Sequence, residues 1–444
     1  MRYIPNTDDD LQQMLQSIGV PDFEDLLKNI PASVRYLHEL NVPPALPESE
    51  LIDHVAGLAE KNQHFESVFA GAGAYDHYIP AVLGNLLSRP EFMTAYTPYQ
   101  PEVSQGTLQS IYEFQSMISA LTDLPVSNAS MYDGASALAE AALLAVRLNG
   151  RKEVLIAGNV NPHYIETIKT YLSGAEIKPV IVPIQDGLVD YKHLRNHLSH
   201  QSAAFIMQNP NFLGLIENVA EIAGDVKQSG ALFIMAYDPI SLGILRSPGE
   251  LGADIACAEG QPLGLPLAYG GPYVGLFSIR QDLVRKLPGR LAARTVDVDG
   301  RTGYVLTLQT REQHIKRERA TSNICTNQQL CALAVTIYLA LMGKTGIRRV
   351  AELCLANAHY AAERITQLPG YEMRFAAPFF REFVVQTPIA PKKIISRLAR
   401  YNILAGVDLG NFKIGFKGCL MISVTEKQTR QQIDDLIYRL TMVK

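Results

Sequence analysis

The spacing of hydrophobic and polar positions changes along the chain, and the first ninety residues show helical spacing interrupted by prolines. Thr7 is followed by three aspartates and then by apolar residues three to four positions apart. A hydroxyl and carboxylates are typical of a helix start, because they satisfy free amide hydrogens and meet the positive end of the helix dipole. A second helix is expected after the proline-rich stretch 41–50. We interpret residues 1–90 as a helical N-terminal arm that packs on another surface.

From about residue 130, short apolar runs alternate with helical stretches. The runs are EVLIAGNV, KPVIVPI, AAFIMQNP and ALFIMAYDP. They are nearly all apolar, as in strands that are buried on both faces. Strands that alternate with helices predict a largely parallel sheet with helices on both sides. We therefore expect a large α/β domain over residues 91–325.

The C-terminal part, residues 326–444, begins with a long helical stretch and ends in a smaller α/β unit. Strands are predicted near REFVVQTP and GCLMISV. One face of the long helix is apolar, which predicts a core or subunit contact. Its members are Leu330, Leu333, Ile337 and Leu341. The whole outline resembles the α/β aspartate-aminotransferase fold, which is fold type I of the pyridoxal-phosphate (PLP) enzymes, and by itself this likeness fixes no function.

Composition and charge narrow the classes of function. Apolar residues make up 47% and charged residues 19% of the chain, which indicates a sizeable core and a surface partly covered by another subunit. The net charge of −4 gives no support to nucleic-acid binding, which relies on a basic face. The five cysteines are scattered without C-x-x-C spacing, so we expect reduced thiols rather than disulfides or a zinc site.

The sequence also bears on location. No wholly apolar run reaches the ~18 residues that cross a bilayer. The acidic start of the chain is unlike a transit peptide, which is rich in arginine. We expect a soluble, cytoplasmic protein without a membrane or nucleic-acid partner.

The first candidate for chemistry is the helix start in MYDGASALAEAALLAVRL, residues 131–148. Gly134 and Ser136 lie among the small residues that open this helix. Exposed amide hydrogens and the helix dipole make such an end suited to a phosphate or another anion. An ordinary, closely packed helix start has the same pattern. The pattern alone leaves both interpretations open.

The second candidate is Asp238, at the end of the apolar run ALFIMAYDP. Ligands of open α/β sheets collect at the carboxyl ends of strands. A carboxylate there could keep a pyridinium nitrogen protonated, which makes a pyridoxal ring an electron sink. The alternative is an aspartate that starts a turn with Pro239.

The third candidate is defined by a missing residue. In an aminotransferase, the phosphate-binding helix start comes first along the chain and the aspartate after a strand comes second. The Schiff-base lysine follows at the next strand. No lysine occurs between Asp238 and Arg285, and Gln261 stands near the expected position. A carboxamide cannot form the imine that a primary amine forms. The segment thus has the outline of an active site without its nucleophile.

Four long stretches carry a resemblance to a known family. They are YTPYQPEVSQGTLQSIYEFQ, MYDGASALAEA, GADIACAEGQPLGLPLAYGGPY and KRERATSNICTNQQL. The chain resembles, nearly end to end, the P-protein of the glycine cleavage system, glycine dehydrogenase (decarboxylating), in its alpha form from enzymes split into two polypeptides. Members of this family decarboxylate glycine on PLP and pass the aminomethyl group to the lipoyl arm of the H-protein.

The resemblance carries further implications. In split enzymes the beta subunit carries the cofactor lysine, and Gln261 fits the alpha subunit. The family thus implies PLP on a partner beta subunit, two copies of each subunit, and a lipoylated H-protein as the second partner. It implies no catalytic residue and no metal here, but a vestigial cofactor pocket. The pocket's candidate residues are Gly134, Ser136, Asp238 and Gln261.

Two polar segments are candidates for contact with other molecules. The proline-stiffened loop YTPYQPEVSQG either lines the partner's active site or packs on its own domain. Its candidate side chains are Tyr96, Tyr99, Gln100, Glu102 and Gln105. The basic run REQHIKRERATSN is either a solvated helical face or a docking edge. Its cations are Arg311, Lys316, Arg317 and Arg319, and residues 320–323 are predicted to cap the long helix.

Alternatives to this function remain open. His193, His197 and His200 could share a helical face and bind a metal, but a solvated helix is the simpler interpretation. A chain that keeps this fold purely for assembly would be a non-catalytic scaffold. A pyridoxamine-phosphate enzyme with another base, such as a histidine, is a third possibility, and no histidine lies near Gln261 in sequence.

Overall fold

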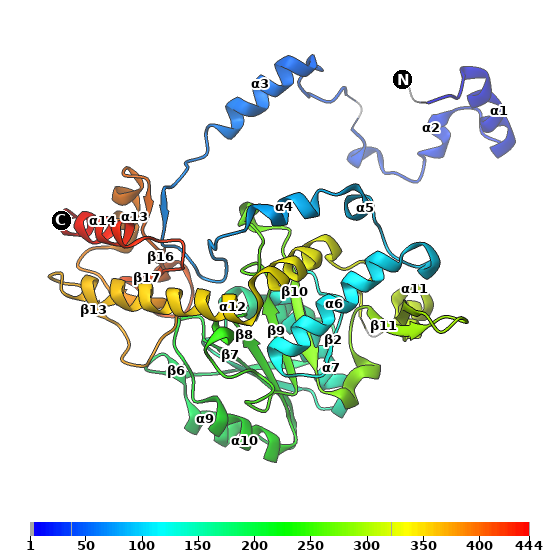
Figure 1. The fold of residues 1–444 in the computed structure, drawn as a ribbon. Helices are drawn as coiled ribbons and strands as arrows, with labels where there is room; N and C mark the ends of the chain where they lie inside the picture. Colours follow the sequence, from blue (N-terminus) through cyan, green and yellow to red (C-terminus); the bar gives the residue numbers. More distant parts are fainter. Residues whose placement is uncertain (1–3, 37, 321, 444) are drawn as a thin grey trace. The chain divides into compact units, whose positions relative to one another are not determined.

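The computed structural model describes residues 4–36, 38–320 and 322–443 (Figure 1). The chain divides into two compact units, Met1–Gln63 and His64–Lys444. Residues 64–90, which we grouped with the arm, belong to the second unit. The division into an arm, a large domain and a C-terminal domain stays a prediction.

The described residues of the first unit form the α-helices α1 (Asp8–Ile18), α2 (Phe23–Leu26) and α3 (Glu48–Ala59). The predicted cap of α1 is confirmed, because the Thr7 hydroxyl accepts the Asp10 amide and the Asp10 carboxylate accepts the Thr7 amide. Helix α3 has no buried residue among those described. Four apolar side chains of α3 are about half exposed, namely Leu51, Ile52, Val55 and Leu58 at 49%, 60%, 52% and 48%.

A seven-stranded sheet forms the centre of the second unit, in the order β2-β10-β9-β8-β7-β3-β4. Strands β3, β4, β7, β8 and β9 pair in parallel, whereas β10 runs antiparallel to β9 and β2. The four predicted apolar runs form β3, β4, β7 and β8. The bounds are β2 (Val126–Ser127), β3 (Glu153–Ala157), β4 (Lys178–Val182), β7 (Ser202–Asn209), β8 (Leu232–Tyr237), β9 (Ile255–Glu259) and β10 (Gly275–Ile279).

Helices pack against this sheet, as the alternating pattern predicts. Helix α7 lies across β7–β10, α8 packs on α7 and β4, and α10 packs on β7 and β8. The helices before the C-terminal part are α4 (Ala81–Leu87), α5 (Pro90–Met93), α6 (Gln105–Thr122), α7 (Gly134–Asn149), α8 (Pro162–Ser173), α9 (Tyr191–His197), α10 (Val219–Ser229) and α11 (Gln313–Lys316). The core contains fully buried strand residues such as Leu155, Phe205 and Ile234.

Short elements complete the unit. Two hairpins are β5 (Ile184–Gln185) with β6 (Leu188–Val189), and β11 (Leu291–Val296) with β12 (Thr302–Thr307). The 3-10 turns are η1 (Ala32–Val34), in the first unit, and η2 (Pro101–Val103), η3 (Ser241–Gly243), η4 (Ala268–Gly270), η5 (Gln281–Lys286), η6 (Gln309–Arg311), η7 (Arg317–Arg319) and η8 (Leu409–Asn411).

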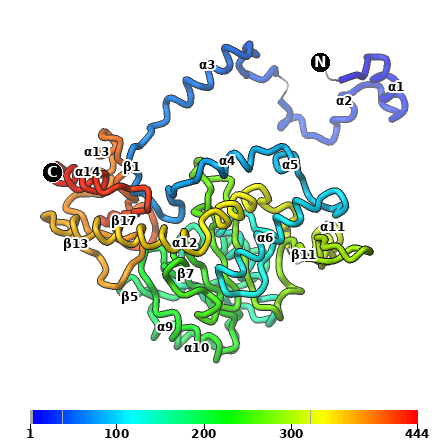
Figure 2. Tube along the Cα trace, in the orientation of Figure 1, coloured from blue at the N-terminus to red at the C-terminus, as the bar shows by residue number. Residues whose placement is uncertain are grey.

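The long helix α12 (Gln329–Thr366) leads from the side of α6 to the C-terminal elements (Figure 2). It breaks at Gly343, whose positive φ of 57° suits glycine. Among the described residues, α12 alone is long and apolar enough to span a membrane by composition. It packs on α4, α6 and α14 and buries residues along its length, so it is a core helix.

The predicted cap of α12 is wrong. The helix begins at Gln329 after Gln328, several residues beyond Ala320, Ser322 and Asn323, and Gln328 makes no capping hydrogen bond. Thr321 lies outside the described residues. The Ser322 hydroxyl instead accepts the Ile324 amide inside a loop.

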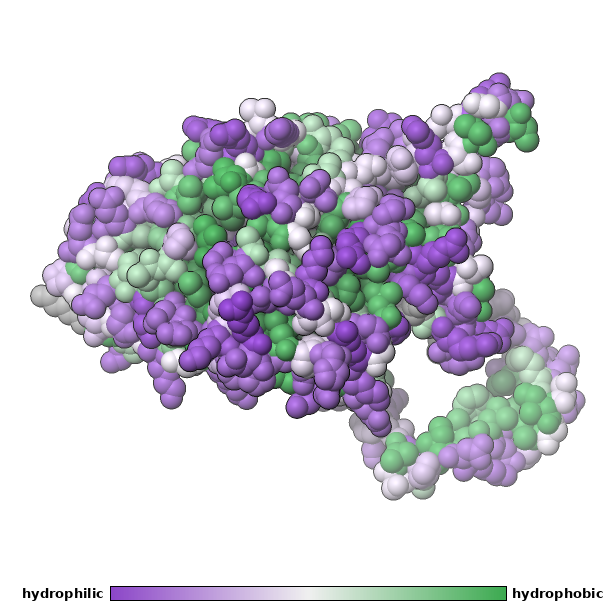
Figure 3. Space-filling model, turned by 90° about the horizontal axis from the view of Figure 1, so that it is seen from below, coloured by the Kyte–Doolittle hydropathy of each residue, from purple (hydrophilic) through white to green (hydrophobic). Residues whose placement is uncertain are grey.

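The C-terminal elements form a second core. A four-stranded antiparallel sheet has the order β13-β14-β17-β16, and β1 pairs in parallel with β15. The bounds are β1 (Ser67–Val68), β13 (Glu372–Met373), β14 (Glu382–Gln386), α13 (Pro391–Ala399), β15 (Ile403–Leu404), β16 (Val407–Asp408), β17 (Cys419–Ser423) and α14 (Arg430–Thr441). Polar side chains cover most of the face in Figure 3, with apolar side chains exposed between them.

Candidate functional site

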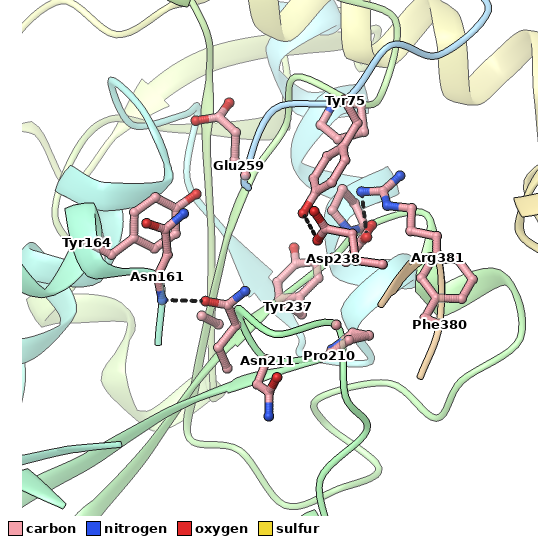
Figure 4. A pocket seen from close by; sticks show the side chains of 17 residues that line it. Tyr75, Asn161, Tyr164, Pro210, Asn211, Tyr237, Asp238, Glu259, Phe380 and Arg381 are labelled. Carbon is pink, nitrogen blue, oxygen red and sulfur yellow. Dashed lines mark hydrogen bonds and ion pairs between the residues drawn. The ribbon is translucent and has the colours of Figure 1, made fainter. Parts of the chain in front are cut away.

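A small cavity lies at the carboxyl ends of β7, β8 and β9, where parallel sheets gather their ligands (Figure 4). Its volume of about 40 Å³ leaves room for a few water molecules. Strand β14 supplies part of the wall from the C-terminal sheet. The lining residues include Tyr75, Asn161, Tyr164, Gln208, Tyr237, Asp238, Glu259, Arg381 and Glu382.

Asp238 follows β8 and faces the cavity, as predicted. The turn interpretation is confirmed, because the Oδ1 of Asp238 accepts the Ile240 amide at 2.9 Å, whereas a role of Asp238 toward a cofactor stays a prediction. Its Oδ2 lies 2.5 Å from Nη2 of Arg381 in an ion pair. The aspartate therefore already has a cation as its partner.

Arg381, immediately before β14, was not found by the sequence reasoning. Its side chain is among the largest that are fully buried, and its guanidinium lies 3.6 Å from the centre of the Tyr75 ring. The guanidinium also contacts Nε2 of His77. One signal was available in the sequence: Arg381 and Glu382 directly precede the apolar residues of a predicted strand. Charged residues are rarely buried unless they are paired, so two charges at this place indicate that they have partners elsewhere in the fold.

Gln261 is 1% exposed and makes hydrogen bonds with both ends of its amide. Its Oε1 accepts the Tyr75 amide at 2.9 Å, and its Nε2 donates to the carbonyls of Tyr75 and Leu265, each at 2.9 Å. Gln261 thus holds the backbone of Tyr75 much as a neighbouring strand would. No lysine occurs among the described residues that line the cavity.

The predicted start of α7 is confirmed at Gly134. Ser136 belongs to its capping box, in which its amide donates to Asp133 at 2.7 Å. The Gly134 amide donates to the Glu259 carboxylate at 3.0 Å. A side chain at Gly134 would come within 2.8 Å of the Glu259 nitrogen, so this close approach requires glycine. The helix start therefore faces an anion, and that anion belongs to the chain itself.

Glu259, the last residue of β9, is the acidic centre of this arrangement. Its carboxylate also accepts the amides of Gln261 at 3.1 Å and Val274 at 3.2 Å. Burial raises the pKa of Glu259 to about 7, although the amide of Gly134 and the other amide donors oppose the shift. The carboxyl group consequently changes its charge near neutral pH.

A second group of buried polar residues joins the segment 71–78 to the C-terminal sheet. Tyr75 donates to Glu382 at 2.6 Å, and the Ala72 amide donates to the same carboxylate at 2.8 Å. Burial raises the pKa of Glu382, while these donors oppose the rise. Sequence spacing gave no sign of these contacts, because the partners lie some three hundred residues apart.

His77, Cys354 and Glu426 place their ligand atoms within 4.8 Å of one another, the distance expected for a metal site. Both ring nitrogens of His77 are engaged, however, because Nδ1 lies 2.7 Å from Glu426 and Nε2 contacts Arg381. Burial alone would raise the pKa of Glu426, but the contacts with His77 and the Tyr78 amide lower it to about 2. The three side chains therefore belong to a hydrogen-bonded network that includes Arg381.

The predicted loop at 96–105 divides into two parts. Tyr99 accepts a hydrogen bond from Arg290 at 2.9 Å, and Gln105 exchanges two hydrogen bonds with the Tyr304 backbone at 2.8 Å. These two side chains therefore bind their own chain. Tyr96, Gln100 and Glu102 are exposed, with Tyr96 at 76%.

The basic run is not one helical face, because α11 and η7 are single short turns. Arg311 turns inward, donating to the carbonyls of Leu287 and Gly289. The exposed cations of the run are Lys316, Arg317 and Arg319. Of the three candidate histidines, His193 and His197 stack with ring centres 3.9 Å apart.

The strand order and the cavity at the strand ends define the class of the protein, the α/β fold type I of PLP-dependent enzymes. A glutamate decarboxylase from Lactobacillus brevis shares this fold at a TM-score of 0.68, with 13% identity and coverage of 93% of this chain and 96% of that one.

The particular family follows from closer matches. The chain belongs to the glycine cleavage system P-protein family, whose model matches residues 1–440. It is 52% identical to a "Probable glycine dehydrogenase (decarboxylating) subunit 1" of Moorella thermoacetica, over 98% of each chain. It is 39% identical to a crystal structure of glycine decarboxylase (P-protein) in inhibitor-bound form, at a TM-score of 0.88 and 100% coverage of both chains.

The residues of this cavity do not fit the cofactor of the class. Gln261 is a carboxamide that cannot form an imine, Asp238 is paired with Arg381, and the Gly134 amide is bonded to a carboxylate.

Proposed function

We propose that this chain is the lysine-free subunit of a two-subunit glycine dehydrogenase (decarboxylating). The observation that supports this most directly is Gln261, a carboxamide at the place of the imine-forming lysine, with its amide engaged at both ends. PLP, which supplies the electron sink for decarboxylation when it is bound, then belongs to the second subunit. The name "subunit 1" printed for the relatives agrees with a second polypeptide.

The activity of the assembled enzyme is the decarboxylation of glycine and transfer of the aminomethyl group to the lipoamide of the H-protein, as in the family. We propose two copies of each subunit. The five free cysteines support a reducing compartment, and we propose the cytoplasm. The chain alone is expected to be inactive.

This chain's own contribution is to complete the partner's site. Tyr96, Gln100 and Glu102 are exposed on a loop whose neighbours Tyr99 and Gln105 tie it to the body of the chain. Such a loop presents donors and a flat aromatic face on a rigid support. We propose that these exposed side chains line the entrance to the second subunit's active site.

The alternatives are weaker. An independent pyridoxamine-phosphate enzyme would need a free base near the cavity. His77, which contacts Arg381 beside the cavity, has both ring nitrogens engaged and a pKa lowered by burial, so it does not supply that base. An assembly scaffold without influence on chemistry is separated from our proposal by the experiment on Tyr96 below.

The first test is reconstitution. The chain and the candidate second subunit are expressed separately, mixed, and assayed for glycine-dependent CO2 exchange in the presence of H-protein. We expect neither subunit alone to be active, and we expect the mixture to be active. Borohydride reduction with peptide mapping should find the pyridoxyl group on the second subunit. Turnover by this chain alone, or full activity of the second subunit without it, contradicts the proposal.

The second test distinguishes a site contribution from scaffolding. Tyr96→Ala should lower kcat of the assembled enzyme roughly tenfold or more, since losing one well-placed contact costs on the order of 1.4 kcal/mol. Val103→Ala, at another exposed position of the loop, is the matched control and should retain activity. Normal kcat for Tyr96→Ala in a correctly assembled complex favours the scaffold.

A further inference from the structure

The cavity contains charges at the two places where a bound cofactor would bring its own. Glu259 presents an anion to the start of α7, and Arg381 presents a cation to Asp238. A phosphate binds at a helix start and a protonated pyridine nitrogen binds a carboxylate, so the signs agree at both places. This inference rests on the proposed function, in which the cofactor is held elsewhere.

At the start of α7, the Glu259 carboxylate occupies the position that a cofactor phosphate would take. The Glu259 carboxylate accepts three backbone amides, from Gly134, Gln261 and Val274, at 3.0–3.2 Å. The Gly134 amide is therefore already engaged. A phosphate could accept a hydrogen bond from the Gly134 amide only after Glu259 had released this amide.

Beside Asp238, the Arg381 guanidinium occupies the position that a protonated pyridine nitrogen would take. Arg381 makes its ion pair with Asp238 at 2.5 Å while its guanidinium lies on the Tyr75 ring at 3.6 Å. A buried ion pair that loses one member leaves an uncompensated charge, which is strongly destabilising. A pyridine ring could reach Asp238 only by displacing this guanidinium.

Gln261 completes the closure through its neutral amide. It accepts from the Tyr75 amide and donates to the Tyr75 carbonyl. A lysine has three donors and no acceptor, so it would leave the Tyr75 amide without its partner. The glutamine is thus a positioning residue for the segment that carries Tyr75 and His77.

We propose that Glu259, Arg381 and Gln261 together replace the cofactor with side chains of the matching charge, and that they keep the cavity closed as a structural core. It follows that the missing lysine is only one of three features that prevent cofactor binding, and the other two are Glu259 and Arg381. Restoring a lysine alone does not create a cofactor site.

The experiment compares full-length variants after incubation with pyridoxal phosphate and borohydride reduction, with the adduct at position 261 measured by peptide mapping. Gln261→Lys should give no more adduct at position 261 than an exposed lysine elsewhere in the same chain gives. Gln261→Lys with Arg381→Ala and Glu259→Ala, which removes all three features that prevent cofactor binding, should give at least tenfold more. The matched control is Gln261→Lys with Arg290→Ala, which removes a buried arginine outside the cavity and should give no increase. A high yield with Gln261→Lys alone overturns the proposal.

A measurement on the unmodified chain covers the case in which variants do not fold. Hydrogen exchange of the Gly134 and Tyr75 amides should be slow, and pyridoxal phosphate should leave it unchanged. Fast exchange at these amides, or a change on adding the cofactor, contradicts a closed cavity. Neither result depends on glycine turnover, so a failure here is distinct from a failure of the two-subunit proposal.

Discussion

Glu259 is the residue of the cavity that changes its charge near neutral pH. Its pKa of about 7 in the folded chain lies above the ordinary value of 4.5. Between these two values the folded chain binds more protons than the unfolded chain, so stability falls as the pH rises through this window. Burial is the main cause of the shift, and the buried charge carries its full cost only above the folded pKa.

The substitution Glu259→Gln tests this assignment. The free energy of unfolding of the wild-type chain should fall by up to roughly 3 kcal/mol from pH 5 to pH 8 through this one group. The variant has no titrating group there, so its stability relative to wild type should rise over the same interval. Urea unfolding at several pH values measures both. Parallel pH profiles for the two proteins would show that Glu259 titrates normally.

At the same scale, the sequence could predict only part of the cavity. Asp238 and Gly134 are placed by local rules, since one ends an apolar strand and the other opens a helix. Gln261 was found because a lysine was expected near it. Tyr75 has no local signal of this kind, and Arg381 has only its place before an apolar run, because their roles depend on contacts between segments that only the folded chain brings together.

Among the secondary-structure elements, the strands of the central sheet were predictable because continuous apolar runs identify strands buried on both faces. The cap of α12 was not. Asn327, in the loop before the helix, donates to the Ala129 carbonyl and to the Ser130 hydroxyl at 3.2 and 2.8 Å. Side chains that can cap helices also make such loop contacts, so a polar cluster before a helix does not locate its first residue.

Helix α3 leads to a prediction about assembly. Its half-exposed apolar residues favour a contact with the second subunit, since a helix with an unpartnered apolar face is usually covered. The double substitution Leu51→Asp and Val55→Asp should weaken assembly at least tenfold, measured by sedimentation of the mixed subunits. Glu50→Gln on the same helix is the control. Unchanged assembly of the double variant would exclude α3 from the interface.

At the scale of the second unit, two hydrophobic cores are joined by α12 and by the polar network around Arg381. Arg381 comes from the C-terminal sheet, whereas Asp238 comes from the central sheet. The ion pair therefore links elements that each have a core of their own. We expect it to couple the unfolding of the two cores.

Arg381→Met tests this coupling. Breaking a buried pair should cost roughly 3 kcal/mol or more, and the unfolding of the central and C-terminal cores should separate into two transitions in calorimetry. Arg348→Met breaks an exposed pair with Glu352 and should change stability by less than about 1 kcal/mol. A single transition in Arg381→Met, at the wild-type temperature, would show that the network couples nothing.

Gln261 has a consequence for how this chain can evolve. Codons for glutamine and lysine differ in one base, so a point mutation can supply the reactive amine at any time. With Arg381 and Glu259 in place, the new amine meets a filled interior rather than an aldehyde, and it also disrupts the support of Tyr75. Selection should therefore remove such mutants for instability, and the division of labour that we propose between two polypeptides would then be protected against reversal in a single step.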